Sequence, residues 1–179
     1  MKSSARIVNF TNEMLNDSRY FLEQAKELDP SHENDWLRWR YLRASIIFSL
    51  GSFEAFVNVF IITCLKNLEL VEDANDYPNQ RISWETKIDK LIPYLTGQKI
   101  NKGTVTWADF KLARTIRSRL MHYCNNSIDI YQDDNPLGVN IKNAEKTINA
   151  VRGMMGIING LIGEPCPSWV NEARSRTIR

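Results

Sequence analysis

The sequence predicts an all-α fold, an up-and-down bundle of about five helices. Apolar residues recur at helical spacing in several long segments of the 179-residue chain. Glycines and prolines are scarce, at 8 and 6, and no Ser/Gly-rich or Pro-rich stretch indicates a linker or disorder. With 43% hydrophobic residues, the chain can bury one sizeable core. We expect one domain over residues 1–163 and a C-terminal tail over 164–179.

Two helices are expected in the first part of the chain. The first runs from about Ile7 to Leu28, and Pro30 closes it because the proline ring cannot continue a helix. Polar residues 31–35 supply N-cap candidates for the second. This long helix is expected from Trp36 to about Leu70, with a bend at Gly51 as one option.

The stretch Ala44 to Leu65 within the second helix has the length and apolar content of a membrane span. Glu54 and Asn58 lie in its middle, where a carboxylate exposed to lipid would be costly. A helix buried in a bundle can instead direct such a polar stripe toward a partner or a cleft. We therefore expect no membrane span, although a peripheral or integral membrane helix protein stays open as the least favoured of three hypotheses.

Turn-forming residues follow the second helix. They include Asp-Tyr-Pro-Asn at 76–79 and predict a connecting loop over residues 71–81. Apolar residues at helical spacing then predict a helix over 83–95, which Pro93 would kink or shorten. Another loop is expected over 97–103.

Two further helices are expected in the second half of the chain. Thr106 can cap a helix from Trp107 to about Tyr123, which Asn125 and Asn126 would end. A polar loop over 127–138 leads to a last helix from about Ile141 to Ile162, with apolar residues on one face.

Composition and motifs disfavour several function classes. The 23 basic and 21 acidic residues give a net charge of +2, so a nucleic-acid site would have to be a local patch. Cys64, Cys124 and Cys166 form no C-x-x-C pair, which disfavours a disulfide framework or a zinc site. The N-terminus lacks the apolar core of a secretory signal, so the expected location is cytoplasmic. No phosphate loop or zinc-protease motif occurs, and we expect no metal and no cofactor.

The predicted helix 107–123 carries the segment Arg-Ser-Arg-Leu-Met-His at 117–122. On an ideal helix one side, expected to face the core, gathers Leu112, Ala113, Ile116, Leu120 and Tyr123. The opposite side carries Phe110, Arg114, Arg117, Ser118, Met121 and His122. Arg117 and His122 would lie about 140° apart and would not touch. Such a mixed face predicts a partner surface, where a second copy of the chain would bring both pairs to one cleft.

That cleft would suit the cleavage of RNA, which carries its own nucleophile in the 2′-hydroxyl beside the scissile phosphate. An imidazole such as that of His122 can accept or donate the proton near neutral pH. The guanidinium of Arg117 can bind phosphate oxygens and stabilise the charge that develops. Ser118 could orient His122 from one turn away.

Other polar residues could support this chemistry. Glu54 and Asn58, one turn apart, could face the cleft, although Glu54 could equally be half of a structural ion pair with an arginine. Arg43, Arg114 and Arg119 could extend a phosphate-binding surface, or form an ordinary solvated face.

An Arg-x-x-x-x-His motif near the end of a late helix, in a small helical bundle, resembles the HEPN superfamily. The run SLGSFEAFVN at 49–58 is similar to the HEPN helix in which an apolar run holds a Glu and an Asn. The resemblance covers roughly Trp36 to Tyr123. It implies a HEPN-like bundle and a metal-independent endoribonuclease that acts as a homodimer, with Arg117 and His122 as catalytic residues. It also implies a toxin or antiviral-defence role, with an antitoxin or other regulatory protein as a further partner.

The sequence departs from the family pattern at two positions. Many members carry Asn or another polar residue directly after the Arg, where this chain has Ser118, and some toxins carry Tyr where it has Cys124. The subfamily therefore stays open. Since family members without catalysis also exist, the competing hypothesis is an inactive helical module that uses the same face to bind a protein.

Overall fold

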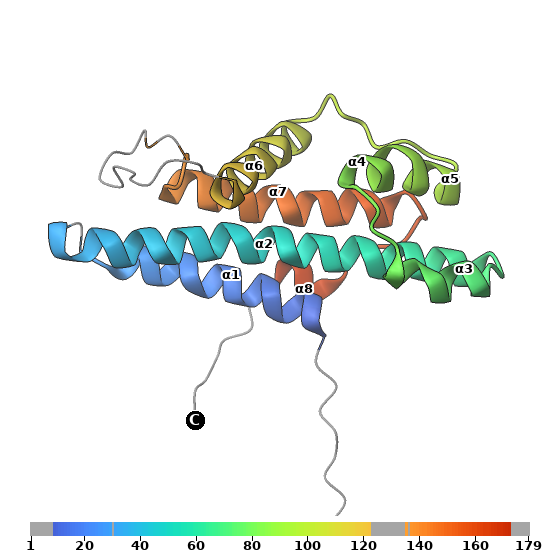
Figure 1. Ribbon diagram of the computed structural model, residues 1–179, viewed down its shortest axis with the longest axis horizontal. Coiled ribbons are helices and arrows are strands. Elements are labelled where there is room, and N and C mark those ends of the chain that lie inside the picture. Colours follow the sequence, from blue (N-terminus) through green and yellow to red (C-terminus); the bar gives the residue numbers. More distant parts are fainter. Residues whose placement is uncertain (1–8, 30, 123–134, 136, 173–179) are drawn as a thin grey trace, which may run out of the picture.

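The computed structural model describes residues 9–29, 31–122, 135 and 137–172. Within these ranges the regular elements are all helical, which confirms the predicted all-α bundle. Three long helices lie lengthwise side by side (Figure 1): α1 (Phe10–Glu27), α2 (His32–Asn67) and α7 (Ile141–Gly160). A fourth, α6 (Val105–Met121), crosses them obliquely. The short elements are α3 (Val71–Asp76), η1 (Tyr77–Asn79), α4 (Trp84–Thr86), η2 (Lys87–Leu91), α5 (Ile92–Thr96) and α8 (Ser168–Asn171).

The first two helices pack closely against each other through small polar residues. Ser49 donates a hydrogen bond to Ser18 at 2.9 Å, and Ser52 donates to the carbonyl of Thr11 at 2.7 Å. Gly51 belongs to the same contact, since a Cβ there would clash with Met14 of α1. The helix is continuous through this glycine, and the absent side chain leaves room for the terminal methyl group of Met14.

The boundaries of this helix pair differ modestly from the prediction. Helix α1 begins at Phe10 with Asn9 as its cap, and ends at Glu27 before Leu28 turns extended. The expected start at Ile7 and the terminating Pro30 lie outside the described residues. Helix α2 begins four residues before the predicted Trp36, at His32, and ends at Asn67 before Leu70.

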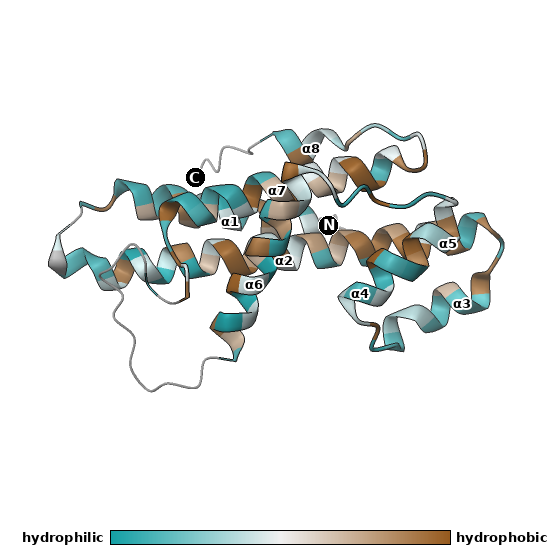
Figure 2. Ribbon diagram, turned by 90° about the horizontal axis from the view of Figure 1, so that it is seen from above, coloured by the Kyte–Doolittle hydropathy of each residue, from teal (hydrophilic) through white to brown (hydrophobic). Residues whose placement is uncertain are grey.

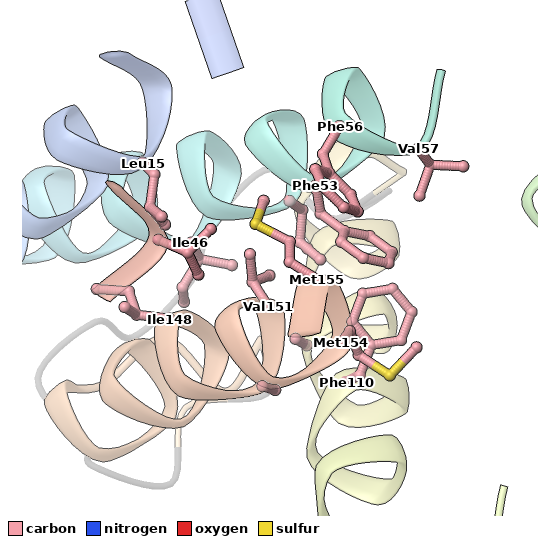
Figure 3. Close-up of a cluster of buried hydrophobic side chains, with 14 of the residues drawn as sticks. Leu15, Ile46, Phe53, Phe56, Val57, Phe110, Ile148, Val151, Met154 and Met155 are labelled. Atoms are coloured by element: carbon pink, nitrogen blue, oxygen red, sulfur yellow. The ribbon is translucent and has the colours of Figure 1, made fainter. Parts of the chain in front are cut away.

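The core lies where α1, α2, α6 and α7 meet (Figure 3). Leu15 of α1, Phe53 of α2 and Phe110 of α6 are almost completely buried. The rings of Phe53 and Phe110 meet edge to face, with centroids 4.7 Å apart. Val151 and Met154 of α7 close the cluster from the opposite side. Many further apolar side chains of α2 are buried in the same core.

By length and composition alone, one helix among the described residues could cross a membrane, namely Glu33–Asn67 of α2. Half of its most apolar window is buried inside the bundle. A core helix of a soluble bundle passes the same test, so this finding adds no support for a span.

The segment after α2 is more regular than predicted. In place of the expected loop over 71–81, the structure has helix α3 and the 3₁₀ turn η1. The prediction was wrong because turn-forming residues are also compatible with short helical turns when tertiary contacts anchor them. Here Ala74 and Tyr77 are buried and provide that anchor.

The predicted helix over 83–95 consists of three consecutive helical pieces, α4, η2 and α5. The middle piece, η2, is a π-helical turn in which Ile92 donates to the carbonyl of Lys87, five residues back. Pro93 follows Ile92 in the chain and has no N–H to donate to the carbonyl of the residue four positions before it. The helical segment nevertheless continues past Pro93 to Thr96, so the proline does not shorten it, and the irregularity is the wider π-helical turn before it.

Two details of α6 differ from the prediction. Its cap is Thr104, whose hydroxyl accepts from the backbone N–H of Trp107 at 3.1 Å, and not Thr106. Its buried face contains Phe110, which we expected on the partner face, whereas Leu112 is exposed. The reason is the oblique crossing, which places Phe110 beside the ring of Phe53. The expected end of the helix at Tyr123, with Asn125 and Asn126, lies outside the described residues, as does most of the loop over 127–138.

Close approach of α6 and α7 depends on Gly153. A Cβ at this position would lie 2.7 Å from Cγ2 of Thr106, a stiff β-branched side chain. We expect Gly153→Ala to lower the free energy of unfolding by about 1 kcal/mol. Overpacking costs about 1–3 kcal/mol, and the gain in helix propensity offsets only about 1 kcal/mol of it. Urea unfolding measures this change.

Two controls test the cause. Gly160→Ala, in the same helix, places its Cβ in open space and should not destabilise the protein. Adding Thr106→Ser to Gly153→Ala removes Cγ2 and should restore the lost stability. A Gly153→Ala variant as stable as the original protein would contradict this account of the α6–α7 contact.

Part of the predicted tail packs onto the bundle. Helix α8 contacts α1 and α7, and Val170 is completely buried. Arg19 of α1 and Arg152 of α7 both donate hydrogen bonds to the carbonyl of Val170. Residues 164–172 are thus attached to the bundle, while 173–179 lie outside the described residues.

Candidate functional site

A pocket of about 300 Å³ lies beside the C-terminal half of α6. Its floor includes Leu50 of α2, and Trp84 of α4 forms part of its wall. The remaining lining residues belong to the predicted motif face. They are Arg114, Arg117, Ser118 and Met121 of α6, and His122 directly after the helix. In Figure 2 the C-terminal end of α6 projects out from the bundle, and the α6 residues that line the pocket belong to this half of the helix. Both predicted catalytic residues and Ser118 therefore line one pocket.

The end of α6 explains how Arg117 and His122 come to line the same pocket within one chain. The angle of about 140° treats His122 as part of a regular helix, but the last helical residue is Met121. His122 has φ −123° and ψ 23°, outside the helical region, although its N–H still donates to the carbonyl of Ser118 at 3.0 Å. Its side chain is exposed at the helix end.

Arg117 is held from the core side by Glu54 of α2. Nη2 of Arg117 lies 3.7 Å from Oε2 of Glu54, and both side chains are partly exposed, at 37% and 36%. An ion pair with this exposure contributes little to stability, at most about 1 kcal/mol. The ion pair instead positions the Arg117 side chain, because it places the predicted supporting residue Glu54 next to the predicted catalytic residue Arg117.

A second cation, Lys87, shares the same carboxylate. Its Nζ lies 3.9 Å from Oε1 of Glu54 and donates a hydrogen bond of 2.8 Å to Oδ1 of Asn58. Tyr77 also donates to this Asn58 oxygen, at 3.1 Å. Asn58 is thus linked to Glu54 through Lys87, and Glu54 in turn contacts Arg117 on the pocket wall.

Sequence reasoning missed Lys87, although a signal was present. In the predicted helix over 83–95, Lys87 falls on the apolar side with Trp84, Ile88 and Leu91. The structure buries it. A lysine on an apolar helix face needs a buried partner, because burying an unpaired ammonium is costly. The spacing therefore indicated a partner without identifying Glu54 and Asn58.

Arg114 lines the pocket through a different contact. Its guanidinium lies over the ring of Trp84, 5.8 Å from the centroid, and forms an ion pair with Glu85. The hydrogen bond from Arg114 lowers the pKa of the Glu85 carboxyl, which is exposed. Part of the Arg114 charge is therefore already neutralised at the rim.

The two other predicted RNA-binding arginines do not line the pocket. Arg43 lies over the ring of Trp39, 4.5 Å from its centroid, on the N-terminal half of α2. From there to Glu54 is about 16 Å along the helix axis. Arg119 is exposed on α6 and absent from the pocket wall.

The surroundings of Tyr77 in this network raise the pKa of its phenol. Burial, and then the nearby charge of Glu54, raise the pKa of Tyr77 to about 12. A tyrosine in an unfolded chain has a pKa near about 10. The folded state therefore keeps its proton where the unfolded state loses it. The resulting stabilisation is complete below about pH 10 and is lost as the pH rises toward 12.

We expect Tyr77→Phe to remove this loss. Between about pH 10 and 12 the original protein should lose on the order of 2 kcal/mol more unfolding free energy than the variant does. Urea unfolding at several pH values in this window measures the difference. Parallel pH profiles for the two proteins would show that Tyr77 titrates as in the unfolded chain.

Among the residues that the structure describes, no group of three or more His, Cys, Asp or Glu side chains is placed to hold a metal ion. The described chain also brings no other histidine side chain to the pocket. The groups available for chemistry there are an imidazole, two guanidinium groups and a hydroxyl.

No family model, curated protein or solved structure matches this chain. A function must therefore be inferred from the chemistry of the pocket and from the resemblance of its motif.

Proposed function

We propose that this chain is a metal-independent endoribonuclease of HEPN type, with a composite active site formed by two copies of the chain. The observation that supports the proposal is the pocket itself, where Arg117, Ser118 and His122 line one cavity. A guanidinium and an imidazole around one cavity provide an anion-binding group and a proton carrier together.

In the proposed reaction the 2′-hydroxyl of RNA attacks the adjacent phosphorus, and the bond from phosphorus to O5′ breaks. The products are a 2′,3′-cyclic phosphate and a 5′-hydroxyl end. His122 accepts the proton of the attacking hydroxyl or donates one to the leaving oxygen. Arg117 stabilises the negative charge that develops on the phosphate oxygens. No metal is needed, because the nucleophile belongs to the substrate.

A second copy of the chain would complete this chemistry. The reaction needs one proton accepted and one donated on opposite sides of the phosphorus, and a single imidazole serves only one side at a time. His122 lies at the projecting end of α6 beside Met121, whose side chain is 62% exposed. Apolar surface at the rim of a polar pocket is suited to contact with a second copy, which would bring a second His122 to the site.

The test is RNA cleavage with excess EDTA, using an RNA oligonucleotide and a DNA oligonucleotide of the same sequence. We expect the RNA to be cut to cyclic phosphate and 5′-hydroxyl ends, and the DNA, which lacks the 2′-hydroxyl, to stay intact. Cleavage that requires added metal, or equal cleavage of DNA, would contradict the mechanism. No cleavage of any RNA would favour the inactive protein-binding module.

The dimer is tested separately by sedimentation at micromolar concentration. An active chain that is strictly monomeric would exclude the composite site while leaving the ribonuclease proposal intact.

A further inference from the structure

The Glu54 carboxylate lies between two cations that use different oxygens. Arg117 approaches Oε2 at 3.7 Å, and Lys87 approaches Oε1 at 3.9 Å. The carboxylate therefore has two counter-ions, of which one would suffice to balance its charge. Arg117 is the one that lines the pocket.

The two cations differ in their freedom to move. The side chain of Lys87 is 8% exposed, its ammonium donates to Asn58 at 2.8 Å, and it lies 5.9 Å from the centroid of the Trp84 ring. These contacts hold the ammonium next to Glu54. The guanidinium of Arg117 lies 3.7 Å from the Glu54 carboxylate, a longer distance than the 2.8 Å hydrogen bond from Lys87 to Asn58. The Arg117 side chain is also 37% exposed. Arg117 can therefore turn toward the pocket while Lys87 stays.

This difference matters when a phosphate enters the pocket, because Glu54 and the phosphate then compete for the same guanidinium. If Arg117 were the sole counter-ion, its departure would leave a partly buried carboxylate uncompensated. Since Lys87 remains at Oε1, Glu54 keeps a counter-ion after Arg117 has left.

We propose that Lys87 is a positioning residue that neutralises Glu54 and so allows Arg117 to transfer from Glu54 to a phosphate group of bound RNA. This role rests on the proposed ribonuclease function, which supplies the phosphate. Asn58 contributes to this role, since its side-chain oxygen accepts a hydrogen bond from the Lys87 ammonium and holds it in place.

The test measures binding of a 2′-O-methyl RNA oligonucleotide, which has no free 2′-hydroxyl and cannot be cut. Fluorescence anisotropy gives the dissociation constant. Lys87→Met keeps the length of the side chain and removes its charge, so Glu54 should retain Arg117 and binding should weaken about tenfold. The matched control is Lys90→Met, at an exposed lysine of the same π-helical turn, which should bind within about twofold of the original protein.

A second substitution separates this role from a merely structural one. In Glu54→Gln the competing carboxylate is absent, so Lys87→Met added to Glu54→Gln should not weaken binding further. If loss of Lys87 only damaged the local fold, binding would weaken by the same factor in both backgrounds. Equal weakening in both backgrounds would therefore overturn the proposal, as would a folded Lys87→Met protein that binds normally.

Because Lys87 is buried, a third variant guards against unfolding. Asn58→Asp is nearly isosteric and keeps the oxygen that accepts from Lys87 and Tyr77. The added carboxylate draws the Lys87 charge away from Glu54, so binding should weaken as in Lys87→Met. Unchanged binding by Asn58→Asp would overturn the proposal.

The outcomes also separate the two proposals. If the original protein cuts RNA but these substitutions leave binding unchanged, only the role of Lys87 fails. If the original protein neither binds the oligonucleotide nor cuts RNA, the ribonuclease function fails and the role of Lys87 fails with it.

Discussion

Replacing His122 by alanine should lower the rate of RNA cleavage by about 100- to 10,000-fold. His122 is the only imidazole that the described chain brings to the pocket, and it lies at the end of the helix that carries Arg117. Without it, water would have to move the protons of the attacking and leaving oxygens. Single-turnover cleavage of RNA in EDTA measures the loss.

The fold should survive this substitution. The His122 side chain is exposed, and its backbone N–H, which bonds to the carbonyl of Ser118, is unchanged in alanine. Circular dichroism and the melting temperature provide the control, and added imidazole should restore part of the rate. Cleavage in EDTA that His122→Ala leaves intact would show that the motif histidine is not catalytic.

Replacing Arg117 by alanine should lower cleavage by about 100- to 1,000-fold, as expected when one donor to a developing anion is removed. The loss should appear mainly in kcat if the guanidinium contacts the phosphate most strongly in the transition state. Stability should change by less than about 1 kcal/mol, because the ion pair with Glu54 is partly exposed. Steady-state kinetics and urea unfolding measure the two effects.

Two further variants identify the cause. Arg117→Lys keeps the charge and loses the planar fork, so it should recover only part of the rate. Lys111→Ala removes a cation from an exposed position of the same helix that does not line the pocket, and should have little effect. Equal losses in Lys111→Ala and Arg117→Ala would indicate a general electrostatic effect of α6 and would exclude a specific role for Arg117.

The sequence predicted part of the site because its chemistry is local. Arg117, Ser118 and His122 are close in the chain, so any regular helix places them at one end of the same element. Glu54 was predicted from a polar position within an apolar helix, and the arginine with which it forms an ion pair is Arg117. Lys87 was missed because its partners, Glu54 and Asn58, lie on α2. The apolar spacing around Lys87 shows only its own helix, over residues 83–95.

Errors in the prediction of α6 arose from the helix-wheel argument. A wheel assigns the core side by apolar content alone, and by that criterion Leu112 and Phe110 are equivalent candidates. Helix packing decided between them, since the ring of Phe110 lies against Phe53 and α6 crosses α7 closely at Gly153. A wheel also assumes that the helix continues, whereas α6 ends one residue before His122.

By itself, the sequence determined the helical class of the fold, the approximate limits of the long helices and the identity of the motif residues. These depend on apolar spacing, caps and proline, which act over one or two turns. Only the tertiary structure decided that α6 crosses the bundle obliquely, that Phe110 is buried, and that Glu54 is shared by Arg117 and Lys87. Those features depend on side chains from α2, η2 and α6 meeting in space, and no local pattern encodes such long-range packing.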